Sequence, residues 1–181
     1  MKKLPIGISD FKELVEDNRF YYIDKSDLIT DIMDNGAKVI LLPRPRRFGK
    51  TLNLSMLNYF FDIEEDSREL FQGLSVYDNQ AIMNHANKYP IIYISFKDVK
   101  EESFEKSKNK IYSLIRGEFA KHEKSIAKVI DSISSEDRDN YFKIIKREAQ
   151  QEDYENGFKL LSKLLWVQCL KITIDTYLKG C

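Results

Sequence analysis

The apolar positions of this chain recur with a helical period over residues 100–165. Apolar side chains there lie three and four positions apart, which predicts amphipathic helices. They form four stripes: Phe104, Ile111, Leu114, Ile115 and Phe119; Ile126, Val129, Ile130 and Ile133; Tyr141, Ile144 and Ile145; Tyr154, Phe158, Leu161, Leu164 and Leu165. The faces between the stripes are dense in Lys and Glu, which indicates solvated helix surfaces with charge pairs.

Short apolar runs outside this region predict strands. Residues 39–42 form a run that a proline ends, and residues 91–96 are nearly all apolar. Continuous apolar runs of this length are typical of strands that are buried on both faces. Residues 170–175 are a third candidate, although a lysine and a threonine interrupt them. The pattern therefore predicts an α/β fold with these strands and a helical elaboration over 100–165.

Two short helices are predicted before the first apolar run. One covers residues 10–16, and Ser9 is its candidate N-cap. The other carries the apolar residues of 28–33, with Asp24 or Ser26 as its candidate cap. A glycine follows its expected end, as is common after helices.

A candidate phosphate-binding loop joins the run at 39–42 to a further helical pattern. Gly49, Lys50 and Thr51 come between the two, so the order is strand, loop, Gly-Lys-Thr and helix. A helix N-terminus presents free N–H groups and the positive end of the helix dipole, which suits a phosphate. Gly49 has no side chain to block a close phosphate. Lys50 would reach the β- and γ-phosphates, and the Thr51 hydroxyl is the candidate Mg²⁺ ligand.

The loop departs from the full glycine-rich pattern at its first position. That position holds Arg44, and Pro43 and Pro45 fix φ and remove backbone donors around it. A Gly-Lys-Thr match by itself arises by chance in many proteins. The alternative interpretation is therefore a basic turn before a core helix. The expected strand before the loop and the expected helix after it argue against this alternative.

Several segments together carry a resemblance to a known family. They are Pro5-Ile6-Gly7, Phe11-Lys12-Glu13-Leu14, Tyr21-Tyr22-Ile23-Asp24-Lys25-Ser26, Arg44-Pro45-Arg46-Arg47-Phe48-Gly49-Lys50-Thr51-Leu52 and Tyr89-Pro90-Ile91-Ile92-Tyr93-Ile94-Ser95-Phe96. They resemble the AAA-ATPase-like proteins of bacteria and archaea, in whose loop arginines and proline also replace the first glycine. The resemblance is specific over residues 4–98, looser to 165, and absent after that.

The resemblance implies a three-layer P-loop NTPase-like domain that binds ATP and Mg²⁺. In this family the domain commonly precedes a PD-(D/E)xK nuclease-like domain. The implied phosphate cradle is Arg46, Arg47, Phe48, Gly49, Lys50, Thr51 and Leu52, mainly through backbone N–H groups. The implied wall near the adenine is Tyr21, Tyr22 and Lys25, for which core aromatics and a surface charge are the alternative.

The C-terminal residues depart from the family pattern. In the resembled family a strand ending in Asp-Glu-Tyr-Asp follows the helix that matches 154–165. The corresponding strand here would end in Asp175, a candidate Mg²⁺ ligand, and Thr176 stands where a Glu would orient the attacking water. We therefore expect a single domain over 1–181 that is incomplete at its C-terminus, either as a truncated form or as a reduced protein. Hydrolysis is expected to be absent or very weak.

Composition and charge narrow the class of protein. The chain has 181 residues, of which 43% are hydrophobic and 32% are charged, and its formal net charge is zero. Zero net charge implies no global attraction to nucleic acid or anionic membranes. No apolar stretch is as long as a membrane span, and no apolar segment of a signal peptide follows the N-terminus. Cys169 and Cys181 form no disulfide framework, so a cytoplasmic protein is predicted. The resemblance to a family of bacteria and archaea implies a prokaryotic protein.

Further polar residues were weighed as ligands. His85 and His122 have no partner at ligand spacing, so each is predicted to be a surface or capping histidine. Asp98 follows the run at 91–96, where ligands gather in open α/β sheets. It is a candidate water or Mg²⁺ contact, and a capping or surface carboxylate is the alternative.

The functional prediction is an ATP-binding domain with nucleotide as its ligand and no membrane partner. One rival is a non-hydrolysing interaction module or truncated remnant, with a protein partner or self-association. Another is a nucleic-acid-associated protein that acts with a nuclease-like partner domain. The neutral charge and the lack of aromatic residues among the basic ones argue against nucleic-acid binding by this chain alone.

Overall fold

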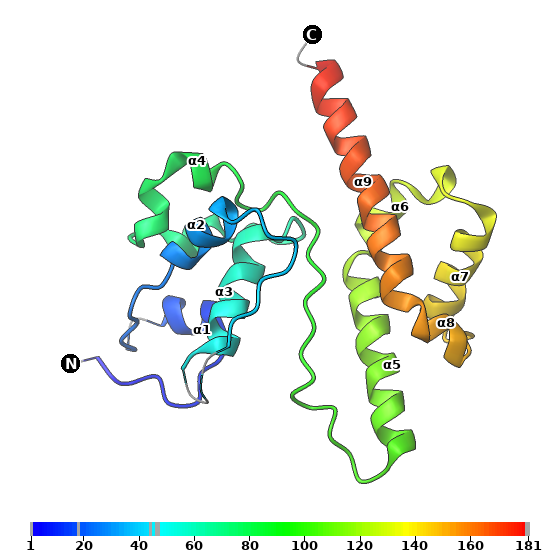
Figure 1. The fold of residues 1–181 in the computed structure, drawn as a ribbon, viewed down its shortest axis with the longest axis horizontal. Coiled ribbons are helices and arrows are strands. Elements are labelled where there is room, and N and C mark those ends of the chain that lie inside the picture. The colour runs from blue at the N-terminus through cyan, green and yellow to red at the C-terminus, as the bar shows by residue number, and fades with distance from the viewer. Residues whose placement is uncertain (1, 18, 44, 46–47, 180–181) are drawn as a thin grey trace. The chain divides into compact units, whose positions relative to one another are not determined.

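The structure is a computed structural model that describes residues 2–17, 19–43, 45 and 48–179, with 170–179 described by their backbone alone. The described residues are mainly helical (Figure 1). Their strand-like pairs are isolated parallel bridges, one between Lys3 and Phe20 and the other between Asp62 and Tyr89. The chain divides into two compact units, Met1–Ile91 and Ile92–Cys181, and each is described by itself.

The predicted three-layer α/β fold is wrong, because no sheet forms among the described residues. Residues 39–42 and 91–96 have no regular secondary structure, and 170–175 lie within a helix. The side chains of Val39 and Leu41 are 85% and 82% exposed, where a buried strand was expected. An apolar run forms a strand only when a neighbouring strand pairs with its backbone and other elements cover its side chains.

The first unit contains short helices around one longer helix. They are α1 (Phe11–Glu16), α2 (Asp27–Asp34), α3 (Lys50–Phe61) and α4 (Gln80–Met83), with 3₁₀ turns at Arg68–Phe71 and Ser75–Asp78 (Figure 1). The N-cap of α1 is Asp10 and not Ser9, since Asp10 Oδ1 accepts a hydrogen bond from the Glu13 N–H at 2.9 Å. A carboxylate serves this purpose well because it satisfies a donor that has no partner within the helix.

Aromatic rings fill the core of the first unit. Phe11 stacks on Phe71 with ring centroids 5.1 Å apart, and Phe60 meets Phe71 edge-on at 5.2 Å. All three side chains are buried. They come from α1, α3 and the 3₁₀ turn at Arg68–Phe71, so their contacts hold α3 against the rest of the unit.

Polar contacts also join α1 to α3. Ser55 Oγ accepts a hydrogen bond from the Phe11 N–H at 3.0 Å and donates one to Asp10 Oδ2 at 3.2 Å. The Tyr59 hydroxyl donates to the same carboxylate oxygen at 3.2 Å. Burial, together with the negative charge of Asp10, raises the pKa of Tyr59 to about 12, so this hydroxyl stays a donor at any ordinary pH.

Asn87 ties the loops that follow α3 to its last turn. Its Nδ2 lies 3.1 Å from the Tyr59 carbonyl oxygen, 3.0 Å from that of Asp62 and 3.0 Å from Ser67 Oγ. Its backbone N–H donates to the Phe60 carbonyl at 2.8 Å. Its φ of 56° lies in the left-handed region, which asparagine adopts more readily than most residues.

The second unit confirms the predicted helical region. Its helices are α5 (Phe104–Lys121), α6 (Glu123–Ala127), α7 (Ser135–Lys146), α8 (Gln151–Glu155) and α9 (Gly157–Lys179), with a 3₁₀ turn at Ile130–Ser132 (Figure 1). The predicted stripes meet in a buried core that includes Ile115, Phe119, Ile126, Ile144, Leu161 and Leu164. Ser134 caps α7 by accepting a hydrogen bond from the Asp137 N–H at 3.1 Å.

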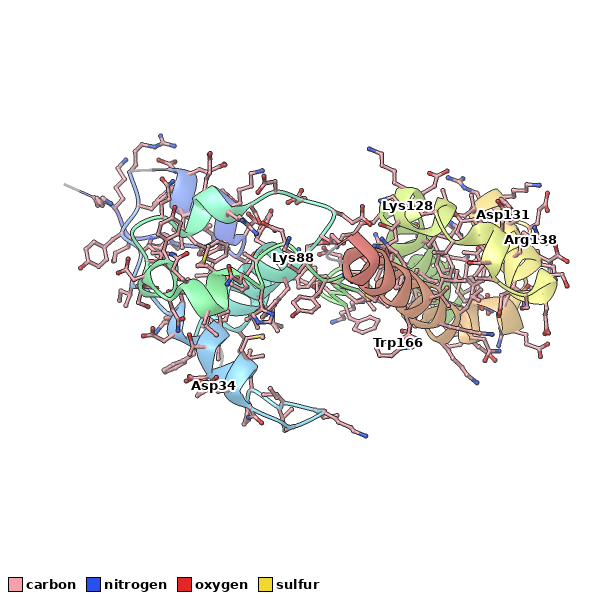
Figure 2. All side chains as sticks on the ribbon, turned by 90° about the horizontal axis from the view of Figure 1, so that it is seen from above. Asp34, Lys88, Lys128, Asp131, Arg138 and Trp166 are labelled. Carbon is pink, nitrogen blue, oxygen red and sulfur yellow. The ribbon has the colours of Figure 1, made fainter. Side chains whose placement is uncertain are left out.

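Helix α9 starts in tight contact with α5. A Cβ atom on Gly157 would lie 2.9 Å from Ile115 Cγ2, which is closer than packed carbon atoms approach. Farther along α9, Trp166 projects away from the helix with 66% of its side chain exposed (Figure 2). Among the described residues, no helix is both long enough and apolar enough to cross a membrane.

The two histidines lie in different environments. His122 is fully buried where α5 ends and α6 begins, and its carbonyl accepts a hydrogen bond from the Ile126 N–H at 2.9 Å. It occupies a capping position, which is one of the two positions expected for it, and it does not lie on the surface. His85 is half-buried and its ring stacks on that of Tyr89.

Candidate functional site

Gly49 lies directly before α3 and is its N-cap. Its φ of 72° and ψ of 20° are left-handed, a conformation that side chains other than glycine rarely adopt. A Cβ at this position would meet only Asn53 Oδ1 within 4 Å, at 3.9 Å, so the backbone and not crowding requires glycine here. The Asn53 N–H donates to the Gly49 carbonyl at 2.8 Å and begins the helix. The helix predicted after Gly-Lys-Thr is thus confirmed.

The first turn of α3 has the properties of an anion site. The first N–H groups of an α-helix have no acceptor within the helix and carry the positive end of its dipole. No side chain caps α3, and its first turn contains no acidic residue. Lys50 and Thr51 are the first residues of the helix, and Leu52 follows. Lys50 also lines a cavity of about 220 Å³ with Ile40, Leu42, Asn53 and Leu54.

A larger cavity, of about 360 Å³, is lined by Gly49 itself. We call it the tyrosine cavity. It is lined by Leu4, Pro5, Leu14, Tyr21, Tyr22, Ile23, Lys25, Phe48, Gly49, Leu52 and Asn53. The fold thus brings the predicted wall residues Tyr21, Tyr22 and Lys25 to the residues of the loop. Its volume lies within the range of roughly 300–1,000 Å³ that is usual for small-molecule sites.

Backbone and ring contacts hold the tyrosines in place. The Tyr21 N–H donates to the Lys3 carbonyl at 2.9 Å. The Tyr22 ring meets Phe11 edge-on at 5.7 Å, and its hydroxyl lies 3.6 Å from Met56 Sδ. Burial raises the pKa of Tyr22 to about 12, so its hydroxyl is neutral in the cavity wall.

Asp24 anchors the same segment on its other side. Its Oδ1 accepts the Ser26 N–H at 2.8 Å, and its Oδ2 accepts the Ser75 N–H at 2.7 Å. Partial burial disfavours the charged carboxylate, but the hydrogen bonds from Ser75 and Ser26 together outweigh it and lower the pKa of Asp24. The cavity wall is therefore tied to the 3₁₀ turn at Ser75–Asp78 as well as to the core.

Asn53 is a residue of this site that the sequence interpretation missed. Its side chain lines both cavities, although the residue is only 4% exposed. Its amide makes no hydrogen bond to any group of the described residues. The sequence spacing could have indicated that Asn53 is buried. It lies three positions before Met56 and seven before Phe60, on the same face of α3 as these core residues.

Other predicted site residues are not brought together. Arg46 and Arg47, like Arg44, lie outside the described residues. Asp175 belongs to the second unit, in α9, and its side chain is outside the described part of the chain. Asp98 is exposed in the second unit. In the part of the chain that the structure describes, no group of three His, Cys, Asp or Glu residues could hold a metal ion.

Comparison with known proteins places the chain in a family. A family model described as "Predicted AAA-ATPase" matches residues 5–158. The chain belongs to this family. Among curated proteins, the "Uncharacterized protein in vnfD 5'region" of Azotobacter chroococcum mcd 1 is 39% identical over 95 residues. That match covers 52% of this chain but 17% of the relative's length. No solved structure matches the chain.

Proposed function

We propose that this predicted AAA-ATPase binds Mg-ATP at the N-terminus of α3. The observation that carries the proposal is the left-handed Gly49 cap immediately before Lys50 and Thr51, in the lining of a cavity of suitable size. Backbone N–H groups at this end of the helix would hold the phosphates. Membership in a family described as "Predicted AAA-ATPase" supports ATP as the nucleotide.

The residues around α3 have distinct proposed roles. The Lys50 ammonium would neutralise phosphate charge, and the Thr51 hydroxyl would contact Mg²⁺. Mg²⁺ is commonly held by substrate phosphates, water and one or two protein oxygens, so a single hydroxyl is a sufficient protein contribution to its shell. Arg46 and Arg47 would add positive charge, and Tyr21, Tyr22 and Lys25 would surround the base.

Hydrolysis by this chain is proposed to be very slow. Neither the tyrosine cavity nor the smaller cavity is lined by an Asp or Glu among the described residues. Phosphoryl transfer depends on positioning and charge stabilisation, and loss of a group that does either lowers the rate by orders of magnitude. Nucleotide binding and release, without turnover, is thus the activity that we propose.

Calorimetry with Mg-ATP on Lys50→Ala tests the site. Binding seen in the parent should be lost in this variant, because the positive charge at the phosphates is removed. Lys12→Ala is the matched control, since Lys12 is an exposed lysine on α1 that lines neither cavity, and it should bind as the parent does. Equal affinity in parent and Lys50→Ala would remove the assignment. Phosphate release near roughly 1 s⁻¹, an ordinary enzyme rate, would contradict slow hydrolysis.

An interaction module is the second candidate function. The highly exposed Val39 and Leu41, two positions apart in the chain, favour it, because exposed apolar patches often mark a protein contact. Both residues lie between α2 and α3, within the first unit. A contact there and nucleotide binding at Gly49 are compatible, since neither Val39 nor Leu41 lines a cavity of the site.

A further inference from the structure

Asn53 is a largely buried residue whose amide makes no hydrogen bond to the described residues. The residue is 4% exposed and lines the tyrosine cavity, and its amide atoms are not among the fully buried side-chain atoms that lack a partner. Buried polar side chains in folded proteins nearly always have a partner, because leaving one unpaired costs free energy. An amide that is kept without a protein partner and faces a cavity is available for a ligand.

Asn87 shows what a structural asparagine looks like in the same unit. Its amide nitrogen lies within 3.1 Å of acceptors on Tyr59, Asp62 and Ser67. Its amide oxygen accepts a hydrogen bond from the Ser67 N–H at 3.3 Å. The Asn53 amide makes no such hydrogen bonds within the described part of the chain. A structural role like that of Asn87 therefore does not explain why an asparagine occupies position 53.

The rest of the tyrosine cavity indicates which ligand group would meet this amide. Tyr21, Tyr22 and Phe48 contribute aromatic rings, and Lys25 is the charged residue among the lining residues described. Aromatic side chains bind planar bases by stacking, and every base has a face that can stack. An amide adds a hydrogen-bond donor and an acceptor at one point.

We propose that Asn53 hydrogen-bonds the nucleoside part of the nucleotide, and that the tyrosine cavity is its binding site. This inference rests on the proposed nucleotide site at Gly49. Asn53 is one helical turn beyond Gly49, and its Oδ1 lies near the cap, 3.9 Å from where a Cβ of residue 49 would be. The phosphates would occupy the helix N-terminus, and the attached nucleoside would enter the cavity beside it.

The uncharged amide fits a nucleoside better than a phosphate. Phosphate oxygens accept hydrogen bonds only, so they would leave the Asn53 oxygen unpaired and repel it. A base edge or a ribose hydroxyl can donate and accept, and so satisfies both ends of the amide. The first turn of α3 already supplies positively polarised N–H groups for the phosphates.

The experiment compares Asn53→Leu with the parent in the full-length chain. Leucine has a similar size but cannot hydrogen-bond. We expect ATP affinity to fall about tenfold, the usual effect of losing one good hydrogen bond to a ligand. Adenosine binding should fall equally, while tripolyphosphate should compete with ATP for the parent and bind the variant unchanged. The melting temperature should stay equal or rise, because the Asn53 amide makes no hydrogen bond within the described fold that its replacement would remove.

Asn58→Leu is the matched control. Asn58 lies on the same helix and its Oδ1 is buried without a hydrogen-bond partner, but it lines neither cavity. Its substitution should leave the affinities for ATP and adenosine unchanged. Should Asn53→Leu not fold, Asn53→Ala gives the same comparison, with the same loss expected for ATP and adenosine.

Other outcomes separate this inference from the proposed function. If Asn53→Leu binds ATP as the parent does, while Lys50→Ala does not bind, Asn53 has no part in a site that nevertheless exists. Equal losses for ATP and tripolyphosphate would also overturn the inference, since Asn53 would then act on the phosphates. A parent chain that binds no nucleotide would overturn both proposals. A lowered melting temperature with unchanged binding would show that Asn53 is structural.

Discussion

At the scale of single residues, Asp24 stabilises the wall of the tyrosine cavity. Its carboxylate accepts hydrogen bonds from the N–H groups of Ser26 and Ser75, and Tyr21 and Tyr22 lie just before it in the chain. The net effect of its surroundings is a lowered pKa, so the folded state favours the charged form more than the unfolded chain does. Stability therefore depends on the ionisation of this one residue.

Asp24→Asn should lower the free energy of unfolding at neutral pH, and the difference from the parent should shrink as the pH falls. The pKa of Asp24 is lower in the folded state, so its contribution is present above the unfolded value. It is lost as the pH falls below about 4, through the folded pKa. Urea unfolding at a series of pH values measures this difference.

Asp31→Asn is the control for this prediction. Asp31 is an exposed residue of α2 whose carboxylate accepts no hydrogen bond from the described residues. Its substitution should change stability little at any pH. A difference for Asp24→Asn that is constant down to pH 3, where about nine-tenths of ordinary aspartates are protonated, would contradict the proposed linkage.

At the scale of elements, the position of α3 depends on contacts in its middle and at its end. Ser55, in the middle of the helix, and Tyr59, in its last turn, donate hydrogen bonds to the Asp10 carboxylate that caps α1. Asn87 donates hydrogen bonds to the last turn and to the loop after it. Together with the aromatic core, these contacts fix the helix axis. The N-terminal turn at Gly49 is thereby presented on a rigid element, as a binding site requires.

Asn87→Ala should destabilise the chain by roughly 2–4 kcal/mol, because it removes the hydrogen bonds of the Asn87 amide and forces alanine into a left-handed conformation. Asn84→Ala is the control, since Asn84 is exposed and its side chain makes no hydrogen bond in the described structure. That variant should stay within about 0.5 kcal/mol of the parent. Urea denaturation measures both variants, and equal stabilities would show that the Asn87 amide is not a structural tie.

At the scale of the whole molecule, the exposed apolar segment 38–42 governs solution behaviour. Val39 and Leu41 are largely exposed, and within the described chain the backbone of 38–42 makes no hydrogen bond. Unpaired extended backbone beside apolar side chains is a template for association between chains. The net charge of zero provides no general repulsion to oppose it.

We expect the 181-residue chain to self-associate when it is expressed alone. Replacing both Val39 and Leu41 by Lys should shift it toward monomer, as light scattering after size-exclusion chromatography would show. Ile6→Lys is the control, because Ile6 is equally exposed, at 89%, but lies outside the segment. A monodisperse parent monomer that melts cooperatively above about 65 °C would contradict this prediction.

The sequence by itself determined the elements that depend on local contacts. Helices α5 and α7 and the part of α9 up to Leu165 follow from apolar spacing, and the Ser134 cap and the start of α3 after Gly49 follow from local chemistry. A helix pairs its backbone within one segment, so the information for it lies within that segment. For the same reason the Gly-Lys-Thr residues could be assigned to a helix N-terminus without a structure.

Only the tertiary structure decided what depends on distant segments. Residues 39–42 have the composition of a strand, but a strand needs a partner, and the described chain provides none. The approach of Tyr21 and Tyr22 to Gly49, the burial of His122 and the unpaired amide of Asn53 likewise result from packing between segments far apart in sequence. No local pattern encodes such neighbours, because burial and pairing are properties of the completed fold.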